Sequence, residues 1–358
     1  MLSAYHRLGD NRYHERIGLD LEEFAPGQRF RHRPGVTLSQ QDNADEALET
    51  LNAAMLHYDA HYAGATTWGR PLMVSTLVLQ RVIGMAAKTY GHRRAILGFS
   101  EIALTAPVFG GDTLYTESEV LDCTPRPDTD GDVAADGDMA NRDAGSSIVT
   151  ARLRALKADG SEVGRFVCRF DILRRGDEAG TIDTQPRFAA YQAAEDGALV
   201  EQTGLFFEDL HPGESFVHAP RRSFAPSASL AHATRALELA PQYHDLDWVA
   251  RRNEGRLVVA ESFVIAQATA ATTRTFGRVV ANLGWYDIDL PHPVHAGDTI
   301  AAESTILETR ASRSRPGEGI VSVTTRARNQ HGITVLTYRR NLLVYRRGGD
   351  SPYAGAGY

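Results

Sequence analysis

The sequence predicts an α+β protein built from two copies of one unit, each an antiparallel sheet wrapped around a long helix. Three observations support this class: a repeat at constant spacing, one long apolar helix pattern in each copy, and alternating strand patterns after each helix. The chain has 358 residues, which is enough for two domains of ordinary size.

The repeat is visible in the sequence itself. "PVFGGDTLYTESEVLD" at 107–122 returns as "PVHAGDTIAAESTILE" at 293–308, so Asp112 and Asp298 lie 298 − 112 = 186 positions apart. The same offset relates other glycines and aromatic residues over roughly 95 positions, and chance matches would scatter instead. The chain is therefore predicted to be a tandem repeat.

The offset changes in the second half of each copy. "SSIVTARLRALKADG" at 146–160 matches "EGIVSVTTRARNQHG" at 318–332 with an offset of 319 − 147 = 172, so the first copy carries 186 − 172 = 14 extra residues. They fall in the Gly-, Asp- and Ala-rich segment 127–145, which has no apolar period. This composition predicts a flexible surface loop.

Helix and strand patterns follow in the same order in both copies. Apolar runs at 75–91 and 261–277 predict the two long helices. "TLYTESEVL" and "IVSVTTRAR" alternate with period two, and "ADG" and "QHG" predict turns between strands. The expected organisation is an N-terminal extension (1–19), a first repeat (20–175), a linker (176–204), a second repeat (205–348) and a flexible tail (349–358).

Composition and charge exclude several partners. The formal net charge of −7 argues against a nucleic-acid partner, which usually needs a basic face. The two cysteines, Cys123 and Cys168, match no metal-ligand spacing and favour a reduced intracellular setting. No signal-peptide pattern and no apolar run of about 18 residues is present. We therefore expect a cytoplasmic protein without a membrane partner.

Several longer motifs carry a resemblance to a known family. They are "LNAAMLHYDAHYA" (51–63), "GRPLMVSTL" (69–77), "ILGFSEIALTAPVFGGDTLYTESEVL" (96–121) and "VANLGWYDIDLPHPVHAGDTIAAESTILE" (280–308). The sequence resembles MaoC-like enoyl-CoA hydratases, which have a double hotdog fold, and within them the mesaconyl-CoA (2-methylfumaryl-CoA) hydratase branch. The resemblance implies a hydro-lyase that adds water reversibly to an enoyl-CoA thioester. It also implies no cofactor besides the coenzyme A of the substrate, and an internal pseudo-dimer, with a further homo-oligomer left open.

The resemblance assigns site residues by position. The motif Asp-x-Asn-Pro-x-His of the family falls on 52–57, where only its histidine is kept, as His57, and Asn52 replaces the aspartate. His57 and Asn52 are thus the expected catalytic pair, and the backbone N–H groups of Ser75 and Thr76 are the expected donors to the thioester oxygen. Asn52 does not titrate, so the identity of the proton donor stays open.

Addition of water to an enoyl thioester requires a base, a proton donor and a group that stabilises negative charge on the thioester oxygen. Histidine suits the first task because its pKa lies near neutrality. Free N–H groups at a helix start suit the last, and Ser75 is an acceptable N-cap residue. Five residues on one continuous helix turn through about 500°, a net 140°, so Asn52 and His57 converge only if the backbone bends between them.

Comparison of the copies predicts one working site. At the 186 offset His57 corresponds to Tyr243, although Asp59 returns as Asp245. The second copy is therefore expected to provide structure and part of the acyl-CoA cleft. Asp59 and Arg70 are further candidates for substrate binding; the Arg70 guanidinium suits a carboxylate, a CoA phosphate or a local acidic partner. No metal is expected.

Other functions stay open at this stage. One is a broad (R)-specific enoyl-CoA hydratase of fatty-acid metabolism, which would lack the cation that a dicarboxylic acyl group needs in its pocket. Others are a thioesterase, which usually needs a carboxylate in the site, and a non-catalytic acyl-CoA-binding protein, which would bind without turnover.

Overall fold

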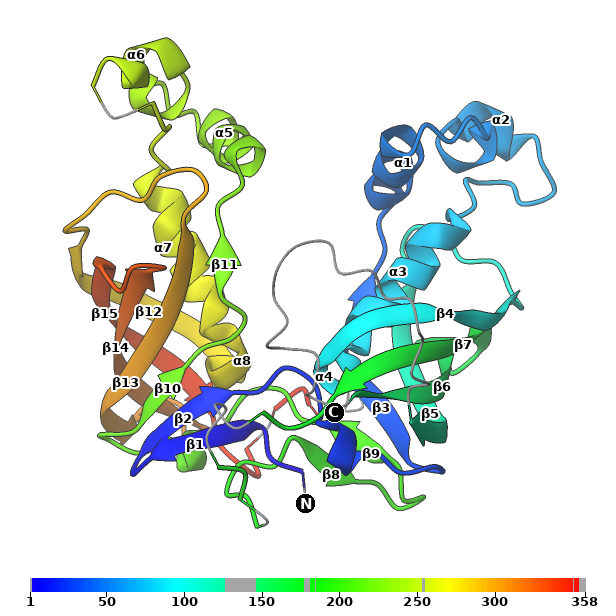
Figure 1. Ribbon diagram of the computed structural model, residues 1–358, viewed down its shortest axis with the longest axis horizontal. Coiled ribbons are helices and arrows are strands. Elements are labelled where there is room, and N and C mark those ends of the chain that lie inside the picture. The colour runs from blue at the N-terminus through cyan, green and yellow to red at the C-terminus, as the bar shows by residue number, and fades with distance from the viewer. Residues whose placement is uncertain are drawn as a thin grey trace.

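A computed structural model describes residues 2–125, 146–176, 181–183, 185–252, 255–349 and 351–353. The molecule has two lobes that meet at their base (Figure 1). Each lobe is a mainly antiparallel sheet packed around a helix, which confirms the predicted α+β class. The loop predicted at 127–145 lies outside the described residues.

The first sheet has the strand order β4-β7-β6-β5-β3-β9-β8. In β5, buried side chains such as Leu114 and Val120 alternate with partly exposed ones, because one face of the sheet covers the helix. The strands are β3 (Arg29–Thr37), β4 (Arg93–Leu104), β5 (Thr113–Pro125), β6 (Ser146–Lys157), β7 (Glu162–Leu173), β8 (Tyr191–Ala193) and β9 (Leu199–Glu201).

The second sheet repeats this order as β2-β10-β13-β14-β15-β12, with β1 outside β2 and β11 against β13. Under the internal repeat β12 corresponds to β4, and β15, β14 and β13 correspond to β7, β6 and β5. The strands are β1 (Tyr5–Gly9), β2 (Arg12–Glu15), β10 (Ser215–Val217), β11 (Arg222–Ser223), β12 (Val279–Asp289), β13 (Thr299–Ala311), β14 (Glu318–Asn329) and β15 (Thr334–Tyr345).

Each predicted long helix is divided into two in the structure. The 75–91 helix becomes α3 (Ser75–Met85) and α4 (Ala87–Tyr90), and the 261–277 helix becomes α7 (Glu261–Ala271) and α8 (Thr273–Phe276). Leu77, Val78 and Val82 of α3 are buried against the sheet, in the apolar core. The remaining helices are α1 (Gln40–Glu49), α2 (Ala60–Gly64), α5 (Pro226–Arg235) and α6 (Leu246–Ala250).

In the described part of the chain, no helix combines the length and apolar character needed to cross a membrane.

Two hairpins are exchanged between the lobes. The hairpin β1–β2 precedes the first repeat, but β2 pairs in parallel with β10 of the second sheet. The hairpin β8–β9 precedes the second repeat, but β9 pairs in parallel with β3 of the first sheet. The segments expected to be an N-terminal extension and a linker therefore each contain a hairpin that joins the lobe of the other repeat.

Two equivalent buried contacts fasten these hairpins. Nδ1 of His32 lies 2.8 Å from Glu201 of β9, and Nδ1 of His218 lies 3.0 Å from Glu15 of β2. All four side chains are at least nine-tenths buried. Because a buried polar group that loses its hydrogen-bond partner is destabilising, each contact holds an exchanged hairpin to the lobe that it joins.

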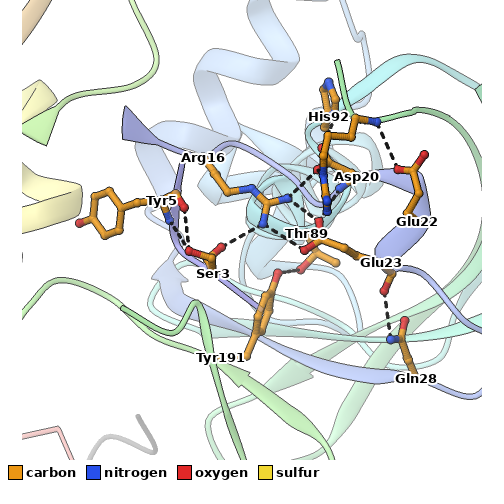
Figure 2. Close-up of polar contacts among 11 residues, drawn as sticks. Ser3, Tyr5, Arg16, Asp20, Glu22, Glu23, Gln28, Thr89, His92 and Tyr191 are labelled. Atoms are coloured by element: carbon orange, nitrogen blue, oxygen red, sulfur yellow. Dashed lines mark hydrogen bonds and ion pairs between the residues drawn. The ribbon is translucent and has the colours of Figure 1, made fainter. Parts of the chain in front are cut away.

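A charged cluster lies around Arg16 and Asp20, ahead of the first sheet (Figure 2). The Arg16 guanidinium donates to Asp20 over 3.2 Å, and Asp20 also accepts from Arg175 over 2.9 Å and lies 2.9 Å from His92. Burial raises the pKa of the Asp20 carboxyl, but the hydrogen bonds from His92 and Arg175 and the charge of Arg16 outweigh it and bring that pKa to about 2. Asp20 therefore stays ionised and holds the chain ahead of the first sheet in place.

Candidate active site

A cavity of about 430 Å³ opens at the start of α3 in the first repeat. His57 reaches it from a short 3-10 turn, Met55–His57, that follows α1. The described lining consists of His57, Trp68, Leu72, Met73, Ser75, Val78, Leu104, Thr105, Ala106, Pro107 and Val108. Most of these side chains are apolar, so the cavity suits an acyl chain with a few placed polar groups.

The segment before His57 is not a continuous helix. Leu51 takes a left-handed backbone conformation with φ of 55° and ends α1. The Asn52 side-chain oxygen then accepts the Ala54 N–H over 3.0 Å. The chain therefore bends without a glycine or a proline, because a side-chain oxygen stabilises the turn.

The second repeat makes the same turn with a different residue. Leu237 has φ of 57°, and the Glu238 carboxylate accepts the Ala240 N–H over 3.0 Å. Asn52 and Glu238 are equivalent under the repeat, and Asn52 is not among the described residues that line the cavity. The structure thus gives Asn52 a role in the turn and does not bring it into the cleft with His57, contrary to the expectation from the sequence.

Asp59 also has a local role in both repeats. Its carboxylate accepts the Tyr62 N–H over 3.0 Å and begins α2, and Asp245 accepts the Trp248 N–H over 2.9 Å and begins α6. An aspartate at this position satisfies a free N–H group of the helix start. Its return in the second copy is therefore explained by helix capping, and Asp59 does not line the cavity.

The orientation of the His57 ring follows from one hydrogen bond. Nδ1 lies 2.8 Å from the carbonyl oxygen of Leu72. A carbonyl oxygen only accepts, so Nδ1 carries the hydrogen and Nε2 of the neutral ring keeps its lone pair. His57 lines the cavity, and Nε2 is the ring nitrogen left to accept a proton, which is the arrangement of a general base.

Asn43 of α1 holds this part of the site together and was not predicted from the sequence. Its side-chain nitrogen donates to the carbonyl oxygens of His57, over 2.8 Å, and Leu72, over 3.0 Å, and its oxygen accepts the Val74 N–H over 2.7 Å. The residue is fully buried. Comparison of the two copies could have selected Asn43, because the equivalent position in the second copy holds a different residue, Ser229.

The start of α3 provides N–H groups at the same cavity. Val74 is the N-cap and Ser75 is the first helical residue, one position later than the capping role predicted for Ser75. The first N–H groups of a helix have no acceptor within the helix and carry partial positive charge. Ser75 lines the cavity; Thr76 does not, and its hydroxyl donates to Glu46 over 3.1 Å.

Arg70 lies at the rim of the cavity. Its guanidinium stacks 3.9 Å from the centre of the Phe109 ring, and Phe109 contacts Trp68, which lines the cavity. Its counterpart Arg256 donates to Asp298 over 3.2 Å. The two arginines therefore differ, and in the first repeat the guanidinium is stacked on a ring next to the cleft.

The equivalent place in the second repeat is chemically different. Tyr243 stands where His57 does, and its hydroxyl donates to Glu261, the first residue of α7 and the counterpart of Ser75. Burial and then the hydrogen bond to Glu261 raise the pKa of Tyr243 to about 12. The neighbouring His244 is hydrogen-bonded to the Glu238 carbonyl. A carboxylate at this helix start would repel an oxyanion, so the second repeat lacks the arrangement found around His57.

No group of three or more metal-ligating side chains is present in the described part of the chain.

Two family models match the two halves of the chain. A MaoC-like domain model matches residues 22–138, and a model described as mesaconyl-CoA hydratase matches residues 183–356. These matches confirm the resemblance to MaoC-like hydratases that the motifs indicated.

Curated relatives carry the same descriptions. The mesaconyl-CoA hydratase of Haloarcula hispanica is 29% identical over 154 residues, and that of Cereibacter sphaeroides is 33% identical over 158 residues. In both cases the matching segment spans 42% of this chain and 43% of the relative, so less than half of each relative's length is matched.

Two solved structures are similar over most of their length. A putative MaoC domain dehydratase from Chloroflexus aurantiacus is 20% identical with a TM-score of 0.39, and covers 92% of this chain and 98% of its own. A Mycobacterium tuberculosis protein described as having a double hotdog fold is 22% identical with a TM-score of 0.39, and covers 92% of this chain and 99% of its own.

Proposed function

We propose that this chain is an enoyl-CoA hydratase with one site, in the cleft at the start of α3. The observation that carries the proposal is the His57 ring, whose Nδ1–H is bound to the Leu72 carbonyl and whose Nε2 is left to act as a base in a cavity that Ser75 also lines. The descriptions of the curated relatives support the same reaction type.

The reaction uses few groups. Nε2 of His57 takes a proton from water while the water oxygen bonds to the β-carbon of the enoyl thioester. The electron pair of the double bond moves toward the thioester oxygen, and the Ser75 N–H at the helix start stabilises the negative charge there. Protonation of the α-carbon then gives the 3-hydroxyacyl thioester.

The same histidine returns the proton. His57 is the only titratable side chain among the described residues that line the cavity, and the turn uses the Asn52 oxygen. The imidazolium formed in the first step is therefore the proposed donor to the α-carbon, so that one residue acts as base and then as acid. This mechanism needs no cofactor besides the coenzyme A of the substrate.

Two classes of substrate acyl group, a branched dicarboxylic one and an uncharged one, are each supported by an observation. The relatives described as mesaconyl-CoA hydratases favour a branched dicarboxylic acyl group. The described cavity lining carries no cationic side chain, which favours an uncharged acyl group because a buried carboxylate needs a partner. Arg70 stacks on Phe109, which contacts Trp68 of the lining, and is the proposed partner if the substrate is dicarboxylic.

The described lining also includes no carboxylate, which weighs against a thioesterase that activates water with an acidic residue. We propose a cytoplasmic setting, with support from the two cysteines, which are both free thiols.

Incubation with mesaconyl-CoA and crotonyl-CoA, followed by mass spectrometry, tests the proposal. We expect a product heavier by one water from at least one of them. Release of free coenzyme A would indicate a thioesterase, and saturable binding without a product would indicate an acyl-CoA-binding protein; either result would contradict the proposed activity.

A further inference from the structure

We propose that a second cavity, beside the hairpin β8–β9, binds a small carboxylate with an apolar body through the buried Arg278. The ligand's carboxylate would supply the charge that the Asp20 side chain supplies in the first repeat. This site goes beyond the proposed hydration and stands on its own observations.

The second cavity has a volume of about 800 Å³. Among the described residues, it shares no lining side chain with the His57 cavity. Its described lining carries three guanidinium groups and one carboxylate: Arg187, Arg278, Arg347 and Asp209. The cavity is therefore separate from the proposed active site and has an excess of positive charge.

Comparison of the repeats shows which group the second cavity lacks. Arg278 corresponds to His92 and Phe206 to Asp20, both at the 186 offset. In the first repeat His92 lies 2.9 Å from the Asp20 carboxylate (Figure 2). The backbone is the same at both positions, with φ and ψ of −77° and 156° at Asp20 and of −78° and 165° at Phe206. The second repeat therefore keeps the cation and has an aromatic ring in place of the anion.

A second cation of the first cluster is also kept. Arg347 corresponds to Arg175 at the 172 offset. Arg175 donates to Asp20 over 2.9 Å, whereas Arg347 donates to Asp209 and its guanidinium lies 4.9 Å from the centre of the Phe206 ring. Two guanidinium groups thus lie against one ring at the place where the first repeat has a carboxylate.

Arg278 is buried without a carboxylate partner. It is 4% exposed, and it donates to the Gly204 carbonyl over 3.2 Å and to the side-chain oxygen of Gln202 over 3.1 Å. In the described part of the chain, Arg278 makes no hydrogen bond or ion pair with a carboxylate. Burial lowers the pKa of its guanidinium, because the neutral groups around it replace water poorly. An anion that entered the cavity would pair with this charge.

The charges around the cavity fit a ligand with one negative charge. Arg187 donates to Glu214, and Arg347 donates to Asp209. Three arginines and two carboxylates leave one positive charge, that of Arg278. A guanidinium binds a carboxylate through two parallel N–H groups, so a monocarboxylate is the expected ligand class.

The rest of the lining fits an apolar body. Leu2, Phe188, Leu199 and Leu205 contribute apolar side chains to the cavity wall. Sites that bind small molecules usually combine such a wall with a few placed polar groups. An alkyl chain attached to the carboxylate would bury against these side chains, which an inorganic anion cannot do.

Titration calorimetry of the whole chain with octanoate tests the proposal. We expect saturable binding at one site, at least about ten-fold tighter than that of octanol, which has the same chain length and no charge. Equal binding of octanol would overturn the role of the carboxylate. Binding of inorganic phosphate as tight as that of octanoate would overturn the role of the apolar body.

Phe206→Asp gives the second repeat the carboxylate of the first. It should weaken octanoate binding at least about ten-fold, because its side chain would pair with Arg278 in place of the ligand. Phe206→Leu adds no charge and should bind octanoate within a few-fold of the wild-type chain. The Tm of Phe206→Asp should be no lower than that of Phe206→Leu. Full octanoate binding by Phe206→Asp, or a lower Tm, would contradict the assignment.

Arg278→Gln removes the proposed ligand cation. It should weaken octanoate binding at least about ten-fold, while His92→Gln, at the equivalent place in the first repeat, should leave it unchanged. Binding that survives Arg278→Gln and is lost in His57→Ala would place octanoate in the other cavity and overturn the proposal. None of these measurements depends on turnover, so their outcome is independent of the proposed hydratase activity.

Discussion

The two repeats share their strand order and the turn that leads to residue 57 or 243, but they differ in the side chains around the start of the central helix. The turn and cap positions are equivalent in function, as Asn52 and Glu238 show, because any suitably placed side-chain oxygen accepts the same N–H. The pairs His57 and Tyr243, Ser75 and Glu261, and Asn43 and Ser229 are not equivalent. Comparison of the repeats therefore separates residues that shape the chain from residues that fit the proposed chemistry.

The largest expected effect comes from His57. His57→Ala should lower kcat by about 10²–10⁴-fold, the usual contribution of general acid–base catalysis. Tyr243→Phe and His244→Ala, at the equivalent place in the second repeat, should each leave kcat nearly unchanged in the same steady-state assay. A greater loss for either control than for His57→Ala would mean that the working repeat has been assigned wrongly.

Ser75→Glu places at the start of α3 the carboxylate that Glu261 provides at the start of α7. It should lower kcat by about 10²-fold or more, because a negative charge would oppose the oxyanion. Ser75→Ala keeps the backbone N–H and should retain kcat within a few-fold. An active Ser75→Glu enzyme would place the thioester oxygen elsewhere.

Asn43→Ser makes the first repeat resemble the second at the residue that links His57, Leu72 and Val74. We expect kcat to fall about 10-fold or more with KM little changed, because small displacements of reacting groups are costly. Ser229→Asn is the matched control and should not alter kcat. A variant that loses thermal stability but keeps the wild-type kcat would show that Asn43 serves folding alone.

Arg70→Gln separates two uses of the guanidinium. If Arg70 binds the substrate carboxylate, KM should rise several-fold for mesaconyl-CoA and stay constant for crotonyl-CoA; if it binds a CoA phosphate, both KM values should rise. Arg256→Gln removes a guanidinium that is bound to Asp298 and should change neither. Unchanged KM values for Arg70→Gln would remove Arg70 from the site.

The smallest effect concerns stability at the base of the lobes. Asp20 binds Arg16 in the first repeat, whereas its counterpart Phe206 lies under Arg278, with the guanidinium 3.8 Å from the ring centre. The pKa of Asp20 is lowered to about 2 on folding, so its contribution is complete above about pH 4 and is lost as the pH falls toward 2. Asp20→Asn should lower Tm by about 2–4 °C at pH 7, with the difference shrinking in acid when measured by differential scanning calorimetry. A constant difference at all pH values would show that the charge is not responsible.

Much of the architecture could be predicted because a helix or strand pattern found in one repeat returns in the other and so supports the same assignment. The 186 offset and the period-two strands led to two equivalent sheets, each with a central helix. The exchanged hairpins could not be predicted in this way, since β1 and β2 have five and four residues and β8 and β9 have three each, and strands of that length show no usable period. Which lobe a hairpin joins depends on long-range packing that no local pattern encodes.

The site was predicted unevenly for a similar reason. His57 and Ser75 were selected through motif position, and the structure places both in the lining of one cavity. Asn52 and Asp59 were selected by the same motif, but their oxygens are used locally by a turn and a helix cap. Asn43 was missed because it acts across three segments, and only its buried hydrogen bonds reveal that.

Hydration in ¹⁸O-labelled water tests the central claim most directly, with crotonyl-CoA and mesaconyl-CoA as substrates and the position of the label read by mass spectrometry. The proposal predicts that the wild-type chain places one ¹⁸O on the β-carbon of an intact thioester, and that His57→Ala does so at least about 10²-fold more slowly. Label in a free carboxylate, with release of coenzyme A, would contradict it, as would equal labelling by His57→Ala.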